Sequence, residues 1–428
     1  MRYVLAVLLV LCLQPVYFFT MANLDRVISH DRTWEHIRGA FDAGILETGY
    51  HSKNQFINGG DRFTDCYSLG EGLQPGVSSA VAGITAARPV SNRHACDDLK
   101  EAAVDPASAH WDRYARYWHG YRVYSAPLAS LFPILVLKII NLLVLIGISA
   151  IFLRQASKLI GTLPTFFLIA PILFCSDFVR LWQVTPHTVS TAVIVGGAAI
   201  FVLALRRQYS TAALVSLAAL LGSIFNFVDF LVNPPWMPML LAFFTAAAGR
   251  PHATRTALLC VGAWFAAYSC TWASKWLFAY VIEPSFDIRP DVFNTAMFRI
   301  AGDNAKVLHI PLAATMKVFG NSLASWGTPL LLILISLFWR KIQIIKFDRR
   351  TFARLGWPAL IPIAWFEILS NHSQIHAFFV SRSAAASIGV IASAALLSSR
   401  LAGLENSHDV VAKDGRRHLV DRLQTGVG

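Results

Sequence analysis

Long apolar segments recur through most of this sequence, separated by short polar connections. An α-helix needs about 20 predominantly apolar residues to cross the roughly 30 Å hydrocarbon core of a bilayer. By this criterion, the sequence predicts about ten transmembrane helices. They are expected near residues 3–20, 132–153, 159–175, 187–205, 210–228, 235–249, 256–279, 325–339, 357–370 and 383–399. The predicted fold class is an all-α integral membrane protein.

The composition supports this class and argues against nucleic-acid binding. Of the 428 residues, 55% are hydrophobic and 14% are charged, which is more apolar than an ordinary soluble domain. The formal net charge is +12. The Lys and Arg residues nevertheless lie mostly between apolar segments and form no continuous basic stripe of the kind that binds nucleic acid.

These basic residues predict the topology, because cytoplasmic loops of membrane proteins carry an excess of Lys and Arg. The residues that fall on one side are Arg2, Arg154, Lys158, Arg206, Arg207, Arg250, Arg255, the segment 340–354, Arg400 and the tail segment 413–422. This side is expected to be cytoplasmic, with both termini there. The first apolar segment is interpreted as an anchor and not as a cleaved signal peptide, since no small-residue cleavage site follows it.

The predicted organisation follows from these assignments. Residues 1–21 form the first transmembrane helix, 22–125 an extracytoplasmic loop, 126–282 transmembrane helices 2–7, 283–324 a second extracytoplasmic loop, 325–400 transmembrane helices 8–10 and 401–428 a cytoplasmic tail. The tail is polar and charged, so we expect it to be disordered.

Two of the six cysteines, Cys66 and Cys96, lie in a polar segment, within the first predicted outer loop. The other four lie in apolar segments, where a thiol behaves as a small hydrophobic group. An extracytoplasmic loop is exposed to oxidising conditions, so a disulfide between Cys66 and Cys96 is predicted.

The first outer loop contains a pair of acidic residues, Asp61 and Asp65, in the sequence Gly59-Gly60-Asp61-Arg62-Phe63-Thr64-Asp65-Cys66. Residues four apart share one face of a helix, so the two carboxylates could act as a general base or bind a metal. The alternative is a solvated loop in which one aspartate caps a helix.

Aromatic residues with polar tips precede the second predicted membrane helix, in the sequence Tyr114-Ala115-Arg116-Tyr117-Trp118-His119-Gly120-Tyr121. Such residues often anchor a helix at the level of the lipid headgroups. They could also form a sugar-binding surface, with Tyr117 and Trp118 stacking on rings while Arg116 and His119 reach hydroxyls or phosphate. Lys138, about one turn into the next helix, either extends its amine outward or contacts a lipid phosphate.

Several other charged residues are predicted at the outer ends of helices, including Asp177, Arg180, Asp229 and Lys275. Ionisable groups at membrane depth usually pair with each other or face a cavity. Their location toward one membrane face favours a site at that face.

A pair of histidines, His372 and His376, lies at the outer end of the ninth predicted helix, followed by Arg382. Histidines four apart share a helical face, as metal ligands or phosphate-binding groups would. Without a convincing third ligand, phosphate or hydroxyl contact is favoured over zinc. No metal ligands are assigned, although a divalent cation stays open as a cofactor.

The overall plan resembles the GT-C superfamily of polytopic glycosyltransferases, which use polyprenyl-phosphate sugars on the extracytoplasmic face. The layout matches over most of the chain: a short N-terminal anchor, a large first outer loop, a second loop after the seventh helix, and about ten spans. The motifs that carry the resemblance are Asp61-Arg62-Phe63-Thr64-Asp65, Arg116-Tyr117-Trp118-His119-Gly120-Tyr121, Phe227-Val228-Asp229-Phe230-Leu231 and Asn371-His372-Ser373-Gln374-Ile375-His376. The bacterial pilin arabinosyltransferases are the branch suggested, and this resemblance implies a bacterial cytoplasmic (inner) membrane.

The resemblance implies an inverting transfer of a single sugar, arabinofuranose in that branch, to a cell-surface glycan or pilin-type protein. A carboxylate of the first outer loop would be the base, and Asp61 and Asp65 match best. Asp31 and Asp42 lie closer to the first helix, where many members carry their acid, so the sequence leaves the base open. The implied substrate-binding residues are Arg116, Tyr117, Trp118, His119, Lys138, Asp229, Lys275, His372, His376 and Arg382.

Other functions fit the same pattern. A transporter or flippase of a lipid-linked sugar would need ionisable groups through the full depth of the bilayer. A polysaccharide polymerase or ligase would also work at the outer face on a lipid-linked donor. No glycine-rich phosphate loop is present, which argues against an ATP-driven machine.

Overall fold

The computed structural model describes residues 4–49, 60–91, 93–229, 231–302, 307–339 and 344–401. Gly59 and Phe230 of the two predicted motifs lie outside these ranges, as does the predicted tail beyond Leu401.

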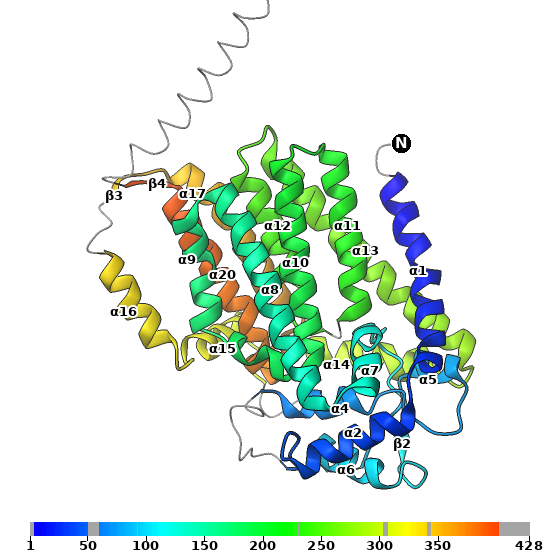
Figure 1. The fold of residues 1–428 in the computed structure, drawn as a ribbon. Coiled ribbons are helices and arrows are strands. Elements are labelled where there is room, and N and C mark those ends of the chain that lie inside the picture. Colours follow the sequence, from blue (N-terminus) through cyan, green and yellow to red (C-terminus); the bar gives the residue numbers. More distant parts are fainter. Residues whose placement is uncertain are drawn as a thin grey trace, which may run out of the picture.

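The described chain is all-α, with a bundle of long helices that run up and down beside one another (Figure 1). The bundle helices are α1 (Val4–Leu24), α8 (Ile134–Ile160), α9 (Thr162–Phe174), α10 (Thr185–Arg206), α11 (Thr211–Val228), α12 (Trp236–Ala247), α13 (Ala253–Ile282), α16 (Thr328–Trp339), α18 (Leu360–Ile368) and α20 (Ala377–Leu397). Each lies on an apolar segment predicted from the sequence.

Six helices of the described ranges are long and apolar enough to cross a membrane: α1, α8, α10, α11, α13 and α20. A seventh span results if α15 (Ala313–Leu323) and α16, which meet at a bend of 73°, are counted as one. The helices α9 and α12 have 13 and 12 residues and are too short by this criterion. The chain is a multi-pass membrane protein, with fewer full-length spans than the sequence predicts.

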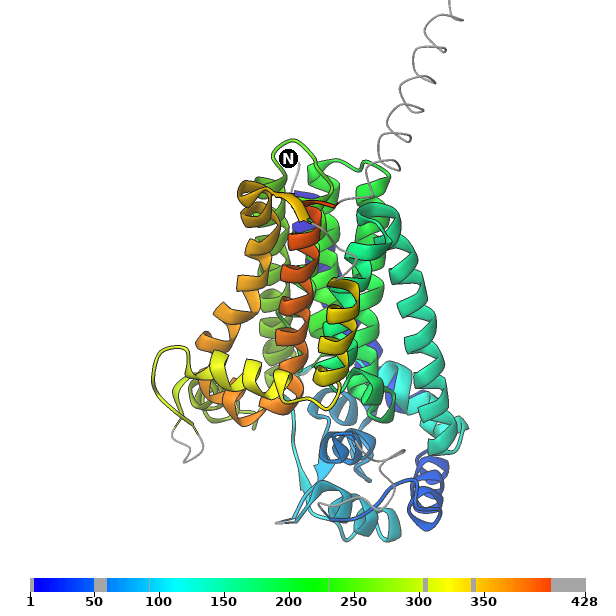
Figure 2. The ribbon, with the colours of Figure 1, turned by 90° about the vertical axis from the view of Figure 1, so that its left-hand side faces the viewer.

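Beneath one end of the bundle lies a separate layer formed by residues 25–49, 60–91 and 93–133, which we call the first-loop layer (Figures 1 and 2). Its elements are η1 (Asp25–Val27), α2 (His30–Asp42), α4 (Arg62–Leu69), α5 (Ser79–Thr85), β1 (Arg88–Pro89), α6 (Ala95–Val104), β2 (Trp111–Asp112) and α7 (Arg122–Leu131). Strands β1 and β2 pair antiparallel. A disulfide joins Cys66 of α4 to Cys96 of α6, and Trp34, Ile37 and Leu99 belong to the buried core around it.

Segments from the second half of the chain complete the end of the bundle that meets this layer, which we call the loop end. They are η3 (Arg289–Asn294), α14 (Thr295–Ala301), α15 and α19 (Ser370–Ile375). The short helix η2 (Phe178–Gln183) also lies at the loop end, between α9 and α10. Four elements lie at the opposite end: β3 (Ile344–Phe347), α17 (Arg349–Gly356), η4 (Trp357–Ala359) and β4 (Ser399–Leu401).

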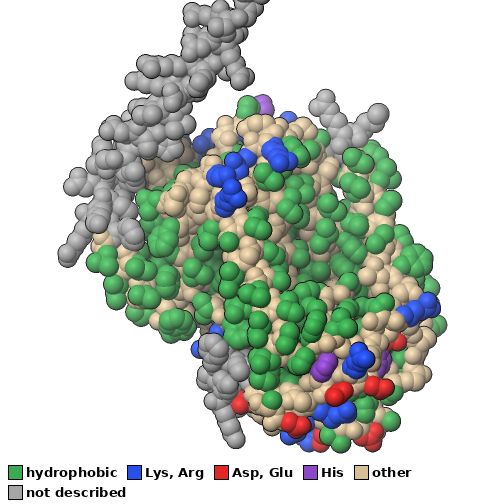
Figure 3. All heavy atoms as spheres, viewed as in Figure 1, with side chains coloured by type: hydrophobic (Ala, Val, Ile, Leu, Met, Phe, Trp, Pro, Cys, Tyr) green, Lys and Arg blue, Asp and Glu red, His purple; other side chains and the backbone are tan. Residues whose placement is uncertain are grey.

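The surface has the charge distribution of a protein that crosses a bilayer. On the face shown in Figure 3, charged side chains gather toward the two ends and hydrophobic side chains cover much of the surface between them. The acidic side chains of that face lie at the first-loop layer. Exposed apolar residues such as Leu143, Ile146 and Ile200 belong in lipid, because water would not favour them.

Close helix packing holds the bundle together. A Cβ at Gly222 of α11 would lie 2.3 Å from the carbonyl oxygen of Trp264 in α13, so only glycine permits this approach. Small residues have the same role at many membrane helix interfaces. Phe225, Trp264 and Tyr268 then fill the space beside the contact.

A second glycine has a structural role in the first-loop layer. Gly72 has φ +69°, and a Cβ there would lie 1.7 Å from Nη2 of Arg122, a fully buried residue that begins α7. Gly76 has φ +75°, but nothing lies within 4 Å of the position that a Cβ would occupy there. The two positions therefore share backbone conformation and differ in crowding.

We predict that Gly72→Ala lowers the thermal denaturation midpoint in detergent far more than Gly76→Ala does. Both substitutions carry the strain of left-handed backbone, about 1–2 kcal/mol, but only the first displaces the Arg122 guanidinium. Equal shifts for the two variants would contradict the predicted packing of Arg122 on Gly72.

Candidate functional site

Charged side chains from distant parts of the sequence meet where the first-loop layer contacts the loop end of the bundle. Asp61 and Asp65 come from α4, Lys138 from α8, His187 from α10 and Arg382 from α20. Each of these residues is buried or nearly so.

The start of α4 positions the two aspartates. Asp61 is the N-cap residue and accepts hydrogen bonds from the backbone N–H of Thr64 at 3.1 Å and from the Thr64 hydroxyl at 2.5 Å. Asp65 follows one turn later and is 3% exposed. Asp61 thus caps a helix, as one interpretation of the sequence allowed, and both carboxylates are directed into the protein and not into solvent.

Asp65 and Lys138 form a buried ion pair with 2.7 Å between Oδ2 and Nζ. The Lys138 amine also donates to the carbonyl oxygen of Gln183 at 2.7 Å, and the other Asp65 oxygen accepts from the backbone N–H of Thr185 at 3.4 Å. Lys138 therefore does not extend outward to the headgroups, which corrects the sequence interpretation. Its charge is compensated inside the protein, where burial separates it from bulk solvent.

Asp61 has no such lysine partner among the described residues. Its side chain is 9% exposed, and burial raises the pKa of its carboxyl above the ordinary value, although the Thr64 hydrogen bonds and the Arg382 charge act in the opposite direction. A carboxylate that binds a proton more readily is better suited to accept one during a reaction. Of the two aspartates, Asp61 is therefore the better candidate for a general base.

Arg382 is held by Asp177, which precedes η2 (Phe178–Gln183). Its Nε and Nη2 atoms each lie 2.6 Å from one Asp177 oxygen, a bidentate pair, and Nη2 also lies 3.1 Å from Nδ1 of His187. The third nitrogen, Nη1, is buried and makes no hydrogen bond within the described chain. Arg382 could thus still donate from Nη1 to a bound anion.

A second group of cations and aromatic rings lies between the first-loop layer and α14. The guanidinium of Arg299 lies 5.6 Å from the ring centre of Tyr117, and that of Arg116 lies 4.8 Å from the ring centre of Tyr114. Nε of Arg116 is buried without a hydrogen bond in the described chain. We call Tyr114, Arg116, Tyr117 and Arg299 the arginine-tyrosine group.

The histidine pair borders this group. His372 Nδ1 lies 3.4 Å from Arg299 Nη1, and its Nε2 lies 3.3 Å from the carbonyl oxygen of Leu231. Burial, followed by the charge of Arg299, lowers the pKa of His372 well below its ordinary value and that of His376 to about 4. Both imidazoles are therefore neutral at pH 7, so neither supplies positive charge to a phosphate.

Four residues predicted to bind substrate make their polar contacts within the fold. Trp118 donates from Nε1 to the Thr271 carbonyl oxygen at 2.7 Å, and Lys275 donates to the Ile84 carbonyl oxygen. Nδ1 of His119 lies 2.9 Å from Oε2 of Glu71. The Asp229 carboxylate accepts from the Ser190 hydroxyl at 2.9 Å and from the Leu231 N–H at 2.8 Å. The first three are fully buried. The contacts of Trp118 and Lys275 attach the first-loop layer to α13, and those of Asp229 hold the connection that follows α11.

Two residues of this region were not identified from the sequence. His187 is an isolated histidine at the start of an apolar helix, and Arg299 lies in a long loop without a recognisable motif. The cost of an ionisable group at a membrane helix end could have drawn attention to His187. Nothing in the sequence distinguishes Arg299 from Arg289, its neighbour in the same loop. The exposed Asp31 and Asp42 lie on α2 and are not part of the buried cluster.

Within the described chain, no three His, Cys, Asp or Glu side chains gather closely enough to hold a metal ion.

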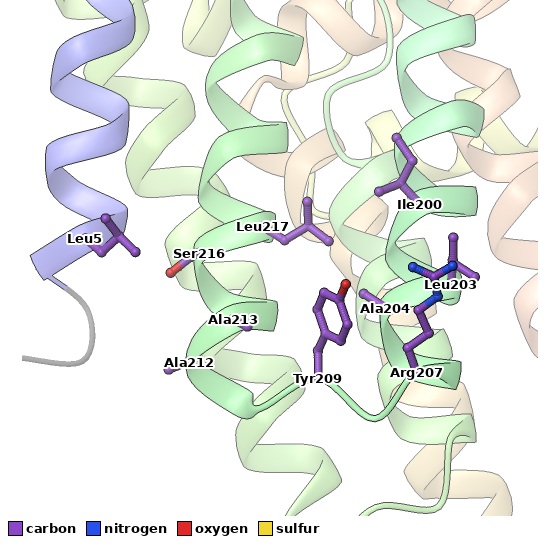
Figure 4. Close-up of a pocket in the computed structure, with 10 residues that line it drawn as sticks. All are labelled: Leu5, Ile200, Leu203, Ala204, Arg207, Tyr209, Ala212, Ala213, Ser216 and Leu217. Atoms are coloured by element: carbon purple, nitrogen blue, oxygen red, sulfur yellow. The ribbon is translucent and has the colours of Figure 1, made fainter.

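A pocket of about 550 Å³ lies away from the polar site, between α1, α10 and α11 (Figure 4). Apolar residues such as Leu5, Ile200 and Leu217 line it, with Arg207 at its edge. His187 and Arg207 lie near opposite ends of α10, about 30 Å apart at 1.5 Å per residue, so this pocket is separate from the polar site.

Comparison with protein-family models gives no match for this chain, and no curated protein or solved structure matches it either. The fold and the site therefore define the class: an all-α, multi-pass membrane protein with a buried polar site at the loop end.

We predict that Lys138→Met destabilises the protein by about 3–5 kcal/mol, because it leaves Asp65 buried without its counter-ion. The double variant Asp65→Leu/Lys138→Met should recover much of the loss in thermal denaturation midpoint. Arg93→Met is the control, since the Arg93–Glu101 pair is 52% and 61% exposed and its loss should change the midpoint little. A double variant no more stable than Lys138→Met would be inconsistent with a buried charge pair.

Proposed function

We propose that this protein is an inverting membrane glycosyltransferase that moves a single sugar from a polyprenyl-phosphate donor to an extracytoplasmic acceptor. The observation that carries the proposal is the buried carboxylate of Asp61, which has a raised pKa and no lysine partner in the described chain, close to Arg382 and His187. Arabinofuranose is the candidate sugar, and a cell-surface glycan or pilin-type protein the candidate acceptor.

In the proposed reaction, the acceptor hydroxyl oxygen attacks the anomeric carbon and its proton passes to Asp61. The bond between the anomeric carbon and the phosphate oxygen breaks, and its electron pair leaves with the polyprenyl phosphate. Cationic donors stabilise the charge that develops on the phosphate. Because Lys138 is paired with Asp65, Arg382 is paired with Asp177 and both histidines are neutral, Arg116 and Arg299 are the cations assigned to this task.

The proposed topology has ten spans, both termini in the cytoplasm and the loop end outside a bacterial cytoplasmic membrane. The short helices α9, α12 and α18 and the bent pair α15 and α16 complete the six full-length spans. Arg206, Arg207 and Arg250 lie at the end opposite the first-loop layer, which the positive-inside rule assigns to the cytoplasm.

The depth of the buried ionisable groups favours an enzyme over a transporter or flippase. Within the described chain, the buried Asp, Glu, Lys, Arg and His residues lie in the first-loop layer or toward the loop ends of helices. The main core cluster of the bundle is instead apolar, with residues such as Phe201, Leu214 and Phe244. A translocation path for a charged lipid headgroup needs ionisable groups at that depth as well. A polymerase or ligase, which also acts at one face, is the nearer alternative.

We predict that Asp61→Asn lowers sugar transfer by about 100- to 10,000-fold, the usual contribution of a general base. The measurement is loss of radiolabel from a panel of polyprenyl-phosphate monosaccharides, with the purified protein in lipid and candidate acceptors added. Asp31→Asn is the matched control, because Asp31 is exposed on α2. Full activity of Asp61→Asn would remove Asp61 from the role. An intact donor across the panel with wild-type protein would favour a polymerase, ligase or transporter.

We predict that Arg116→Gln and Arg299→Gln each raise the KM for the donor by about 10- to 100-fold, the worth of a hydrogen bond to a charged group. Steady-state kinetics with varied donor concentration measures the effect. Arg113→Gln is the control, because Arg113 is 50% exposed and lies 3.7 Å from Glu283. An unchanged KM in both variants would place the phosphate elsewhere.

A further inference from the structure

His187 lies between the bundle and the first-loop layer and contacts charged residues on two sides. It is 1% exposed, one residue after Pro186 in the first turn of α10. Nδ1 of its ring lies 3.1 Å from Nη2 of Arg382, and Nε2 lies 3.9 Å from Oδ2 of Asp61. Phe379 packs against the ring, with 5.8 Å between ring centres.

These contacts determine the protonation state of the imidazole. A guanidinium group only donates hydrogen bonds, so Nδ1 of His187 must be the acceptor. The ring is then neutral and carries its proton on Nε2. Asp177 holds Arg382 in this orientation through two hydrogen bonds of 2.6 Å. The N–H of Nε2 is therefore directed toward the side of the ring where Asp61 lies.

We propose that His187 is a positioning residue that stabilises the ionised form of the Asp61 carboxylate through its Nε2 proton. At 3.9 Å the interaction is that of an N–H dipole with a charge and not a direct hydrogen bond. Buried surroundings strengthen such a dipole, because little solvent screens it. The catalytic meaning of this assignment rests on the proposed function, whereas the electrostatic effect on Asp61 does not.

Other charged or titratable groups of the described chain lie near His187. They include Asp177 and Arg382, the paired residues Asp65 and Lys138, Asp229, which accepts from Ser190 one turn further along α10, and His372 and His376, whose rings lie 6.1 Å and 5.1 Å from Phe379. Asp177 and Arg382 compensate each other, as do Asp65 and Lys138. The hydrogen-bearing groups of the described chain that lie near the Asp61 oxygens include Nε2 of His187 and the two Thr64 donors.

Two substitutions separate this role from simple packing. In His187→Gln, the amide oxygen can accept from Arg382 while the amide N–H₂ points toward Asp61, as the neutral imidazole does. In His187→Phe, the ring volume and the contact with Phe379 are retained, but acceptor and donor are both lost. The two variants therefore test the polar contacts at nearly constant shape.

The experiment follows the ionisation of Asp61 by infrared titration of the protonated carboxyl band in purified protein in lipid. The band is assigned by its loss in Asp61→Asn. We expect His187→Phe to move the midpoint upward by about one pH unit and His187→Gln to leave it near the wild-type value. The acidic limb of the kcat/KM profile for sugar transfer should move with it, since activity is lost as Asp61 becomes protonated.

Several outcomes would overturn the proposal: equal midpoints in wild type and His187→Phe, or an equal shift in His187→Gln and His187→Phe. If His187→Phe does not fold, ¹⁵N NMR of histidine-labelled wild type decides, with the signal assigned by His187→Gln. A proton on Nδ1 would contradict the assignment, and a proton on Nε2 would support it. A shifted infrared midpoint in a protein without transferase activity would refute the proposed function and leave the electrostatic role of His187 standing.

Discussion

The buried ion pair between Asp65 and Lys138 is the contact on which the site depends. Isolated charges cannot remain in a low-dielectric interior, so each of these residues requires the other. The pair fixes α4 against α8, and the Cys66–Cys96 disulfide fixes the same helix against α6. Asp61 caps this helix through its hydrogen bonds with Thr64, so the contacts that hold α4 also place its carboxylate, one turn before Asp65.

This dependence explains which features a sequence can predict and which it cannot. The lengths of the apolar segments predicted the positions of the bundle helices. The spacing of Asp61 and Asp65 indicated two carboxylates one turn apart, and the polar surroundings of Cys66 and Cys96 predicted their disulfide. These are local properties. The partners of Lys138 and Arg382 lie 73 and 205 residues away along the chain, and no local pattern encodes them. The sequence therefore identified charged residues without revealing that Lys138 and Arg382 were already compensated.

The number of full-length spans differs from the sequence prediction for a related reason. A helix of 12 residues is about 18 Å long, shorter than the roughly 30 Å core of a bilayer. In α12, every residue from Trp236 to Ala246 is buried by neighbouring elements, so little of it needs to face lipid. The length rule applies to helices surrounded by lipid. A helix enclosed by protein, with η4 and α17 near its end, can satisfy its terminal groups by tertiary contacts.

The distribution of charge in the site has a chemical consequence. On one side, the carboxylates of Asp61 and Asp177 lie near Arg382 and the neutral His187, so acceptors for a proton are concentrated there. On the other side, Arg116 and Arg299 lie against tyrosine rings, and the adjacent His372 and His376 add no charge. A proton would be drawn to the first side and an anion to the second. A transfer from a phosphate leaving group requires this separation, because the proton of the attacking hydroxyl and the electron pair of the broken bond must depart in different directions. The neutral histidines preserve this separation of charge. A protonated imidazole beside Arg299 would repel its guanidinium, and one beside Asp61 would hold the proton that the carboxylate is proposed to accept.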